Sequence, residues 1–199
     1  LFAGRIFTKS SIQEAIDRAL PGDTVVVGPG TYRQGNIRIG KSIQLIGEGR
    51  PVLDGEHRVE ILTITASDVT VRGFRFIHTA VGSLEDYAAI RVTGAGRVVI
   101  EDNEGEDNFF GFHFSKSHDC VVRNNRLSAH PQESHQAGNG IHLWTCRNFI
   151  ISGNRVTGHR DGIYFEFVTD SKITGNHSEG NIRYGLHFMF SNSNEYRHN

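Results

Sequence analysis

A short pattern of alternating apolar and polar residues recurs in the second half of the chain. Residues 111–114 (GFHF), 140–143 (GIHL), 162–165 (GIYF) and 185–188 (GLHF) share a glycine followed by two apolar positions around one polar or aromatic residue. An asparagine lies 14 residues after each glycine, at Asn125, Asn154, Asn176 and Asn199, and the pair Ala89 and Asn103 keeps this interval one copy earlier. The steps of 22, 29, 22 and 23 residues between these asparagines define an internal repeat.

The period-two alternation predicts short strands whose flanking apolar residues point inward. A second strand is expected in each copy, at residues 98–100, 120–122, 149–151 and 171–173. A repeat of this length with two or three short strands forms one coil of a solenoid. Leucine-rich repeats share the period, but leucine is too scarce here. The sequence therefore predicts an all-β fold, a right-handed parallel β-helix that makes residues 1–199 a single domain.

Asparagine and glycine mark the bends between the predicted strands, because both tolerate positive φ angles. We expect the repeated asparagines to stack on successive coils and to bond to backbone groups and to each other. Their role is therefore structural. One copy is longer than the others, and we expect residues 128–139 to leave the coil as a loop.

The first residues of the chain follow a helical pattern instead. Ser10 and Ser11 precede apolar positions at 12, 15, 16 and 19, and Pro21 and Gly22 end the pattern. We interpret residues 11–20 as a helical cap that protects the edge of the solenoid. No similar cap follows the last repeat, so we expect the chain to be the N-terminal part of a longer protein.

Composition narrows the possible functions. The chain has 21 basic and 22 acidic residues and no basic stripe, which argues against nucleic acid as a partner. No apolar run approaches the roughly 18 residues of a membrane-spanning helix. The two cysteines, Cys120 and Cys146, occupy different positions in their coils, so we expect no disulfide between them and interpret Cys120 as a core residue.

The repeat also aligns side chains in two outward-facing columns. Two residues after the repeat glycine lie Arg91, His113, His142, Tyr164 and His187, and two residues further lie Ser115, Trp144, Glu166 and Met189. Coils of a β-helix are about 4.8 Å apart, so neighbours in a column are close enough to touch. Imidazole and thioether ligands together suit copper, and the thioether favours Cu(I).

Two metal sites are expected from these columns. The first uses His187 and Met189 with Glu166, and a second, weaker one uses His113 and His142 with a histidine of the long loop, His130 or His135. The alternative is that the histidines form a polar stack on the solenoid face. Glycan-cleaving enzymes also use β-helices, but the outward carboxylates (Glu85, Asp86, Glu101 and Glu166) do not align in the repeat register, and Asp161 is interpreted as a turn residue.

Several segments resemble the NosD family. These are residues 160–167 (RDGIYFEF), 169–171 (TDS), 175–176 (GN) and 183–191 (RYGLHFMFS), with the opening segments 12–16, 21–23 and 30–32. The later segments are the more specific, and together the resemblance runs along the whole chain. It implies a β-helix of the pectate-lyase-like superfamily and a chain shorter than usual for the family.

The resemblance further implies a periplasmic accessory protein of nitrous oxide reductase maturation. Such a protein works with an ABC transporter made of NosF and NosY and with the copper chaperone NosL, and it binds copper transiently without being an enzyme. The other function class left open by the residues is a β-helix that binds or cleaves carbohydrate. Copper titration and glycan binding separate the two classes.

Overall fold

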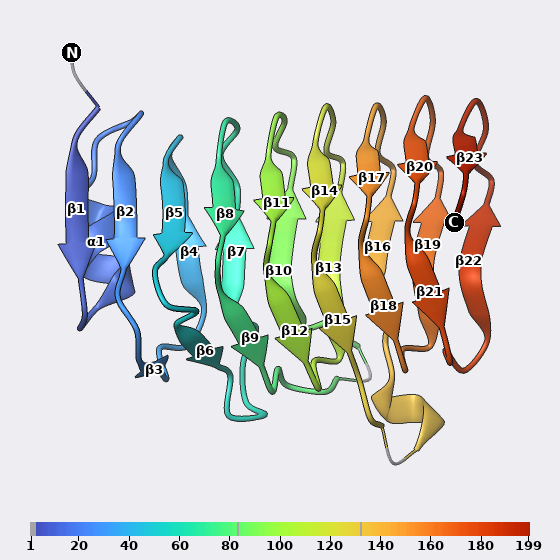
Figure 1. The fold of residues 1–199 in the computed structure, drawn as a ribbon, viewed down its shortest axis with the longest axis horizontal. Coiled ribbons are helices and arrows are strands. Elements are labelled where there is room, and N and C mark those ends of the chain that lie inside the picture. The colour runs from blue at the N-terminus through green and yellow to red at the C-terminus, as the bar shows by residue number, and fades with distance from the viewer. Residues whose placement is uncertain (1–2, 83, 132) are drawn as a thin grey trace.

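A computed structural model describes residues 3–82, 84–131 and 133–199 of the chain. Its strands form three parallel sheets that extend along one long axis, and the chain passes from sheet to sheet in each coil (Figure 1). Every named strand pairs in parallel with the equivalent strand of a neighbouring coil. The predicted parallel β-helix is therefore confirmed.

The three sheets are called first, second and third, and from β5 onward each full coil contributes one strand to the first, then the third, then the second sheet. The first sheet has nine strands: β1 (Arg5–Thr8), β2 (Thr24–Val27), β5 (Gln44–Gly47), β8 (Thr70–Arg72), β11 (Val99–Glu101), β14 (Val121–Arg123), β17 (Ile150–Ser152), β20 (Lys172–Thr174) and β23 (Glu195–Arg197). The second sheet has seven: β4 (Ile37–Ile39), β7 (Leu62–Ile64), β10 (Ala88–Thr93), β13 (Phe110–Ser115), β16 (Ile141–Trp144), β19 (Asp161–Glu166) and β22 (Tyr184–Met189). The third also has seven: β3 (Thr31–Tyr32), β6 (Val52–Asp54), β9 (Arg75–Ile77), β12 (Glu104–Glu106), β15 (Arg126–Ser128), β18 (Arg155–Thr157) and β21 (His177–Glu179).

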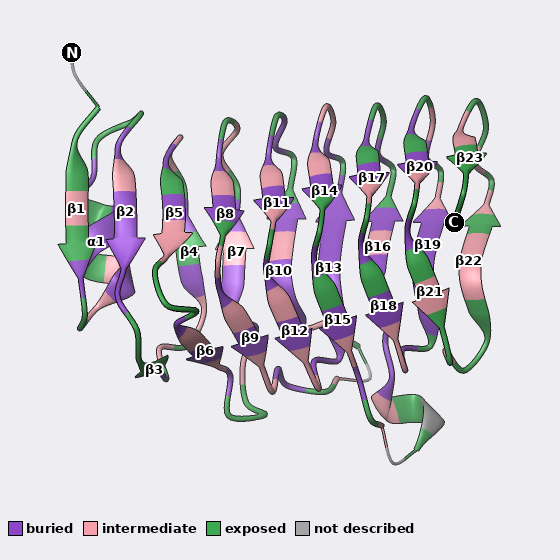
Figure 2. Cartoon of the chain, in the orientation of Figure 1, coloured by how far each residue is buried: buried purple, intermediate pink, exposed green. Residues whose placement is uncertain are grey.

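The apolar residues that alternate along the second sheet fill the core, as expected. The inward pairs of β13, β16 and β19 are fully buried: Phe112, Phe114, Ile141, Leu143, Ile163 and Phe165. Burying side chains of this size contributes about 1.5–3 kcal/mol each. In β22 the inward Phe188 stays 36% exposed, because β22 pairs with β19 alone. Figure 2 shows this change from buried to exposed residues towards the last coil.

The predicted asparagine ladder is present in one bend of the solenoid. The Oδ1 atom of Asn125 accepts hydrogen bonds from the backbone N–H of Asn103, at 3.0 Å, and from its Nδ2, at 3.2 Å. The same two bonds join Asn125 to Asn154, Asn154 to Asn176, and Asn176 to Asn199. Each Nδ2 also donates to a backbone carbonyl, so these buried amides have partners on every side.

The predicted cap is the helix α1 (Ile12–Arg18), which packs against β1, β2 and β4 at one end of the solenoid. The Ser11 hydroxyl accepts a bond from the Glu14 N–H, an N-cap that contributes about 1 kcal/mol. The helix residues Ile12, Ala15 and Ile16 are buried and face the solenoid. The preceding strand β1 was not expected from the sequence, and it pairs with β2 over four residues.

Two sequence-based boundaries need correction. The strands of the first sheet begin one residue later than predicted in each of the four coils, for example at Val99 instead of Val98. The long insertion is shorter than the predicted 128–139, since Ser128 ends β15 and Asn139 is buried with its carbonyl bonded to the Gly111 N–H. The short 3₁₀ helix η1 (Ser134–Gln136) lies within this loop and extends away from the coils (Figure 1).

Candidate functional site

Both predicted columns lie in register on the outer face of the second sheet. The pairing follows the order Arg91, His113, His142, Tyr164 and His187 in one column, which we call the histidine column, and Ser115, Trp144, Glu166 and Met189 in the other. Ring centroids are 4.6 Å apart for His113 and His142, 4.7 Å for His142 and Tyr164, and 4.9 Å for Tyr164 and His187. The rings therefore touch from coil to coil.

The middle of the histidine column is less exposed than the sequence predicted. His113 is only 6% exposed and Tyr164 only 8%, because neighbouring aromatic rings cover the column. Phe110 contacts His113 and His142 at centroid distances of 5.7 and 5.5 Å. Burial, together with His142 and Arg91, lowers the pKa of His113 to about 3, and burial and Arg91 lower the pKa of His142 to about 4. Both imidazoles are therefore neutral at neutral pH.

Hydrogen bonds set the tautomers of these two histidines. Arg91 Nη1 lies 3.3 Å from His113 Nδ1, and a guanidinium can only donate, so Nδ1 accepts and Nε2 carries the proton. Asn139 Oδ1 accepts a bond from the Asp161 N–H, which turns Asn139 Nδ2 towards His142 Nδ1 at 3.2 Å. In both rings, Nδ1 therefore already accepts a hydrogen bond.

His187 has the opposite arrangement. Its Nδ1 lies 3.1 Å from a carboxylate oxygen of Asp161, so Nδ1 donates its proton and, in the neutral ring, Nε2 keeps a free lone pair. Asp161 is fully buried in β19 and also binds Arg183. Although burial alone would raise it, these bonds from Arg183 and His187 hold the pKa of Asp161 below its usual value. The interpretation of Asp161 as a turn residue was therefore wrong.

Met189 and Glu166 meet at the hydroxyl of Tyr164. The Tyr164 Oη atom is 3.2 Å from the Met189 Sδ atom and 3.2 Å from a Glu166 carboxylate oxygen. Burial and the nearby Glu166 raise the pKa of Tyr164, so the phenol keeps its proton. His187 and Met189 lie two residues apart on the same face of β22, as predicted.

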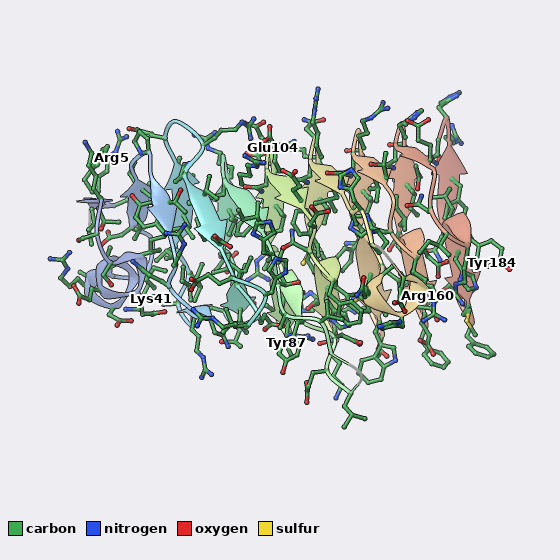
Figure 3. The ribbon with its side chains drawn as sticks, turned by 90° about the horizontal axis from the view of Figure 1, so that it is seen from below. Arg5, Lys41, Tyr87, Glu104, Arg160 and Tyr184 are labelled. Carbon is green, nitrogen blue, oxygen red and sulfur yellow. The ribbon has the colours of Figure 1, made fainter. Side chains whose placement is uncertain are left out.

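These groups line one groove of about 510 Å³ along the second sheet. His142, Tyr164, His187, Glu166 and Met189 line it from the second sheet, as does Phe110 at the start of β13, and Phe109, Ala137 and His135 contribute from the flanking loops. Figure 3 shows Tyr87, which precedes β10 of the second sheet, on the opposite side of the solenoid from Glu104 of the third. The groove lies on the face of the second sheet, between the loop that carries Asp86 and the loop that carries His135.

The two loop histidines lie in different places. The His135 side chain is 71% exposed, lines this groove, and has its Nδ1 3.3 Å from Glu133. The His130 side chain is equally exposed but its Nδ1 binds Asp107 at 2.9 Å, beside a separate hollow with His57. Of the two loop histidines expected to join His113 and His142, only His135 lies at the groove, which His142 lines and His113 does not.

No three His, Cys, Asp or Glu side chains are assembled to hold a metal ion in the described part of the chain. Methionine can also bind a metal. The pair of His187 and Met189 offers one nitrogen donor and one sulfur donor, which fits a soft ion. Cys120 and Cys146 are both buried and free, and burial raises the pKa of their thiols to about 11 and about 12. Thiols this hard to ionise are poor metal ligands.

Solved structures with similar folds include a pectin methylesterase in complex with a hexasaccharide and an alginate lyase from Paenibacillus sp. str. FPU-7. The first is 16% identical, with a TM-score of 0.51 over 90% of this chain and 68% of the other. The second is 16% identical, with a TM-score of 0.46 over 87% of this chain and 75% of the other. At 16% identity the likeness to the pectin methylesterase shows the β-helix fold alone.

A curated relative is the "Probable ABC transporter binding protein NosD" of Pseudomonas aeruginosa strain PAO1. It is 34% identical over 130 residues, which are 64% of this chain and 30% of the relative. No helix among the described residues has the length and apolar character needed to cross a bilayer. The family described as "Periplasmic copper-binding protein (NosD)" matches residues 16–194. Because that match covers most of the sequence, the chain belongs to the NosD family of periplasmic copper-binding proteins.

Proposed function

We propose that this chain receives Cu(I) at the His187 and Met189 pair and passes it on during assembly of the copper centres of nitrous oxide reductase. In this role it acts with the ABC transporter subunits NosF and NosY and the copper chaperone NosL, and it is a binding protein instead of an enzyme. The family supports copper binding in the periplasm, and the relative's name supports a transporter association.

One observation carries the choice of ligands. The Asp161 carboxylate holds the Nδ1 proton of His187 and thereby leaves Nε2 free. A carboxylate behind the histidine orients the ring and strengthens it as a metal ligand. The thioether of Met189, on the same face of β22, prefers Cu(I) to the harder Zn(II).

The other predicted ligands have unequal support. Glu166 lies beside Met189 in the register of the sheet and shares its hydrogen-bond partner Tyr164, which supports it as a further ligand of the same ion. His135 has its Nδ1 directed to Glu133 and reaches the groove from the loop. His113 and His142 use their Nδ1 atoms to accept bonds from Arg91 and Asn139, and each must change tautomer to offer Nε2. We assign them a role in ordering the column.

The test is a Cu(I) competition titration with a chromogenic chelator. The double variant His187→Ala/Met189→Ala should lose at least about tenfold in Cu(I) affinity, the equivalent of about 1.4 kcal/mol. His130→Ala, which removes a histidine outside the groove, is the matched control and should leave affinity unchanged. Equal Cu(I) affinities for the wild type and the double variant would remove this site from the proposal.

A further inference from the structure

The phenol of Tyr164 joins the two columns of the second sheet. Its ring packs between His142 and His187, at centroid distances of 4.7 and 4.9 Å, and the residue is only 8% exposed. Its hydroxyl reaches the other column, where it contacts Met189 of the neighbouring strand and Glu166 of its own strand. Because rings on both sides hold the phenol, its hydroxyl has a defined place between a carboxylate and a thioether.

One proton faces two acceptors at this place. Tyr164 Oη lies 3.2 Å from the Met189 Sδ atom and 3.2 Å from a Glu166 carboxylate oxygen. A phenol has a single O–H to donate, so a stronger bond to one acceptor weakens the bond to the other. The carboxylate is the stronger acceptor, because hydrogen bonds to ionised groups are about twice as strong as neutral ones and a thioether accepts only weakly.

The Glu166 carboxylate is placed to take this proton. Among the residues that the structure describes, Tyr164 is its one hydrogen-bond donor, and Glu166 forms no ion pair with any of them. Glu166 also lies directly across from Met189 in the register of the sheet. The carboxylate therefore competes with the sulfur for the phenol through one of its two oxygens, and the second oxygen stays available.

We propose that Tyr164 is a positioning residue that sets how strongly the Met189 sulfur donates an electron pair to a soft ion, and that Glu166 acts on Met189 through it. A hydrogen bond from Tyr164 occupies one lone pair of the sulfur and withdraws electron density from the other. When that bond shifts to Glu166, the sulfur becomes the better donor. The inference rests on the proposed function, because it adds a control of the same sulfur ligand.

Glu166 also keeps the hydroxyl partnered when the sulfur is used. A hydroxyl that loses its only acceptor in a buried place costs free energy, and Tyr164 is almost entirely covered. With Glu166 beside it, the O–H passes from the sulfur to the carboxylate without being left unpaired. Binding at Met189 is then opposed only by the weak bond to the sulfur.

The experiment measures the reaction of Met189 with hydrogen peroxide in the metal-free protein. Met189 is the one methionine of the chain, so its conversion to the sulfoxide is followed by mass spectrometry of the peptide that carries it. Tyr164→Phe keeps the ring and removes the hydroxyl, and oxidation should become about two- to tenfold faster, as expected for the loss of one neutral hydrogen bond. Tyr184→Phe removes a hydroxyl from another ring that contacts His187, at 4.6 Å, and should change nothing.

A double-mutant cycle tests the part played by Glu166. Glu166→Gln replaces the ionised acceptor with a neutral one, so the phenol bonds more to the sulfur and oxidation should slow by about twofold or more. In the Tyr164→Phe background the same change should have no effect, because the hydroxyl through which Glu166 acts is absent. A purely structural role of Tyr164 would not produce this coupling.

Four outcomes overturn the proposal. An unchanged oxidation rate in Tyr164→Phe would show that the hydroxyl does not affect the sulfur, and an equal rise in Tyr184→Phe would show that only access to the groove has changed. An equal effect of Glu166→Gln in both backgrounds would show that Glu166 acts on Met189 directly. In a protein that binds Cu(I) at this pair, Tyr164→Phe should bind it about two- to tenfold more tightly, and weaker binding would make the phenol an aid instead of a competitor. Because oxidation is measured without copper, failure of His187 and Met189 to bind Cu(I) would affect the proposed function alone.

Discussion

Replacing Asn125 with alanine tests the asparagine ladder in the middle of the solenoid. Asn125 is fully buried, accepts bonds from the Asn103 amide and donates one to the Ile100 carbonyl at 2.9 Å. Alanine leaves the Asn103 N–H without its acceptor and the Ile100 carbonyl without this donor. A buried polar group that loses its partner costs about 1–3 kcal/mol, so two such groups cost roughly 2–6 kcal/mol.

The assay is equilibrium denaturation in urea, followed by circular dichroism. A matched control is Asn199→Ala, because Asn199 makes the same two bonds to Asn176 but is exposed at the last coil. Water replaces the lost partner there, and the cost should stay below about 1 kcal/mol. The variant Asn125→Asp keeps the acceptor but loses the Nδ2 donor, and it places a negative charge against Asn154 Oδ1. It should be at least as destabilising as alanine.

The reasoning would be refuted by equal costs for Asn125→Ala and Asn199→Ala. Equal costs would mean that the stability of the coils comes from the apolar interior and that the ladder only follows it. A mild Asn125→Asp variant would contradict the argument in a second way, since that change keeps the size of the side chain and alters only its charge and hydrogen bonding.

Three further results are expected. Burial lowers the pKa of His159 to about 4, below the ordinary value of about 6.5, so the unfolded chain takes up a proton first as the pH falls. The contribution of His159 to the free energy of unfolding should be complete above about pH 6.5 and fall by up to about 3 kcal/mol towards pH 4. His113 and His142, whose pKa values are also lowered, add to the same fall, so His159→Asn should reduce the fall by about that amount without abolishing it. Replacing residues 131–136 by Gly and Ser should change stability by less than about 1 kcal/mol and keep one cooperative transition, and a broadened transition would show that this loop supports the core. Uronate polymers incubated with the protein should release no unsaturated or reducing ends, and release that Glu166→Gln abolishes would move the groove to the carbohydrate-cleaving class.

The fold could be predicted from the sequence because the same pattern of residues recurs in every coil of a solenoid. Every coil places an asparagine at the same bend and apolar pairs on the same strand, so a constant interval reveals both the strand and the ladder. Strand boundaries were less certain, since residues such as Cys120 and Phe149 face the core at the bend and look like strand residues in the pattern. Strand β1 was missed because Arg5–Thr8 lies before the first complete coil and its partner is β2.

The site was predictable only in part. Register follows from the repeat, so the order of the histidine column and the placing of Met189 beside Glu166 were correct. Burial of His113 was not predictable, because Phe110 covers it from the residue before the repeat glycine, where no regular pattern exists. The tautomers of His113, His142 and His187 are set by hydrogen bonds with Arg91, Asn139 and Asp161, respectively. These bonds depend on how individual side chains are oriented, which the repeat does not specify.

The position just before the repeat glycine differs from coil to coil, unlike the column beside it. It holds Phe110, Asn139, Asp161 and Tyr184 on successive coils, so an apolar ring, an amide, a carboxylate and a phenol follow one another at one point of the fold. Phe110 covers His113, Asn139 holds His142, and Asp161 holds His187. The column of aromatic and imidazole rings is regular, but the residue behind each ring differs. The chemistry of each imidazole is therefore set by the residue that contacts it. Among the histidines of the column, Asp161 is the residue that leaves Nε2 of its partner, His187, free on the same strand face as the Met189 thioether.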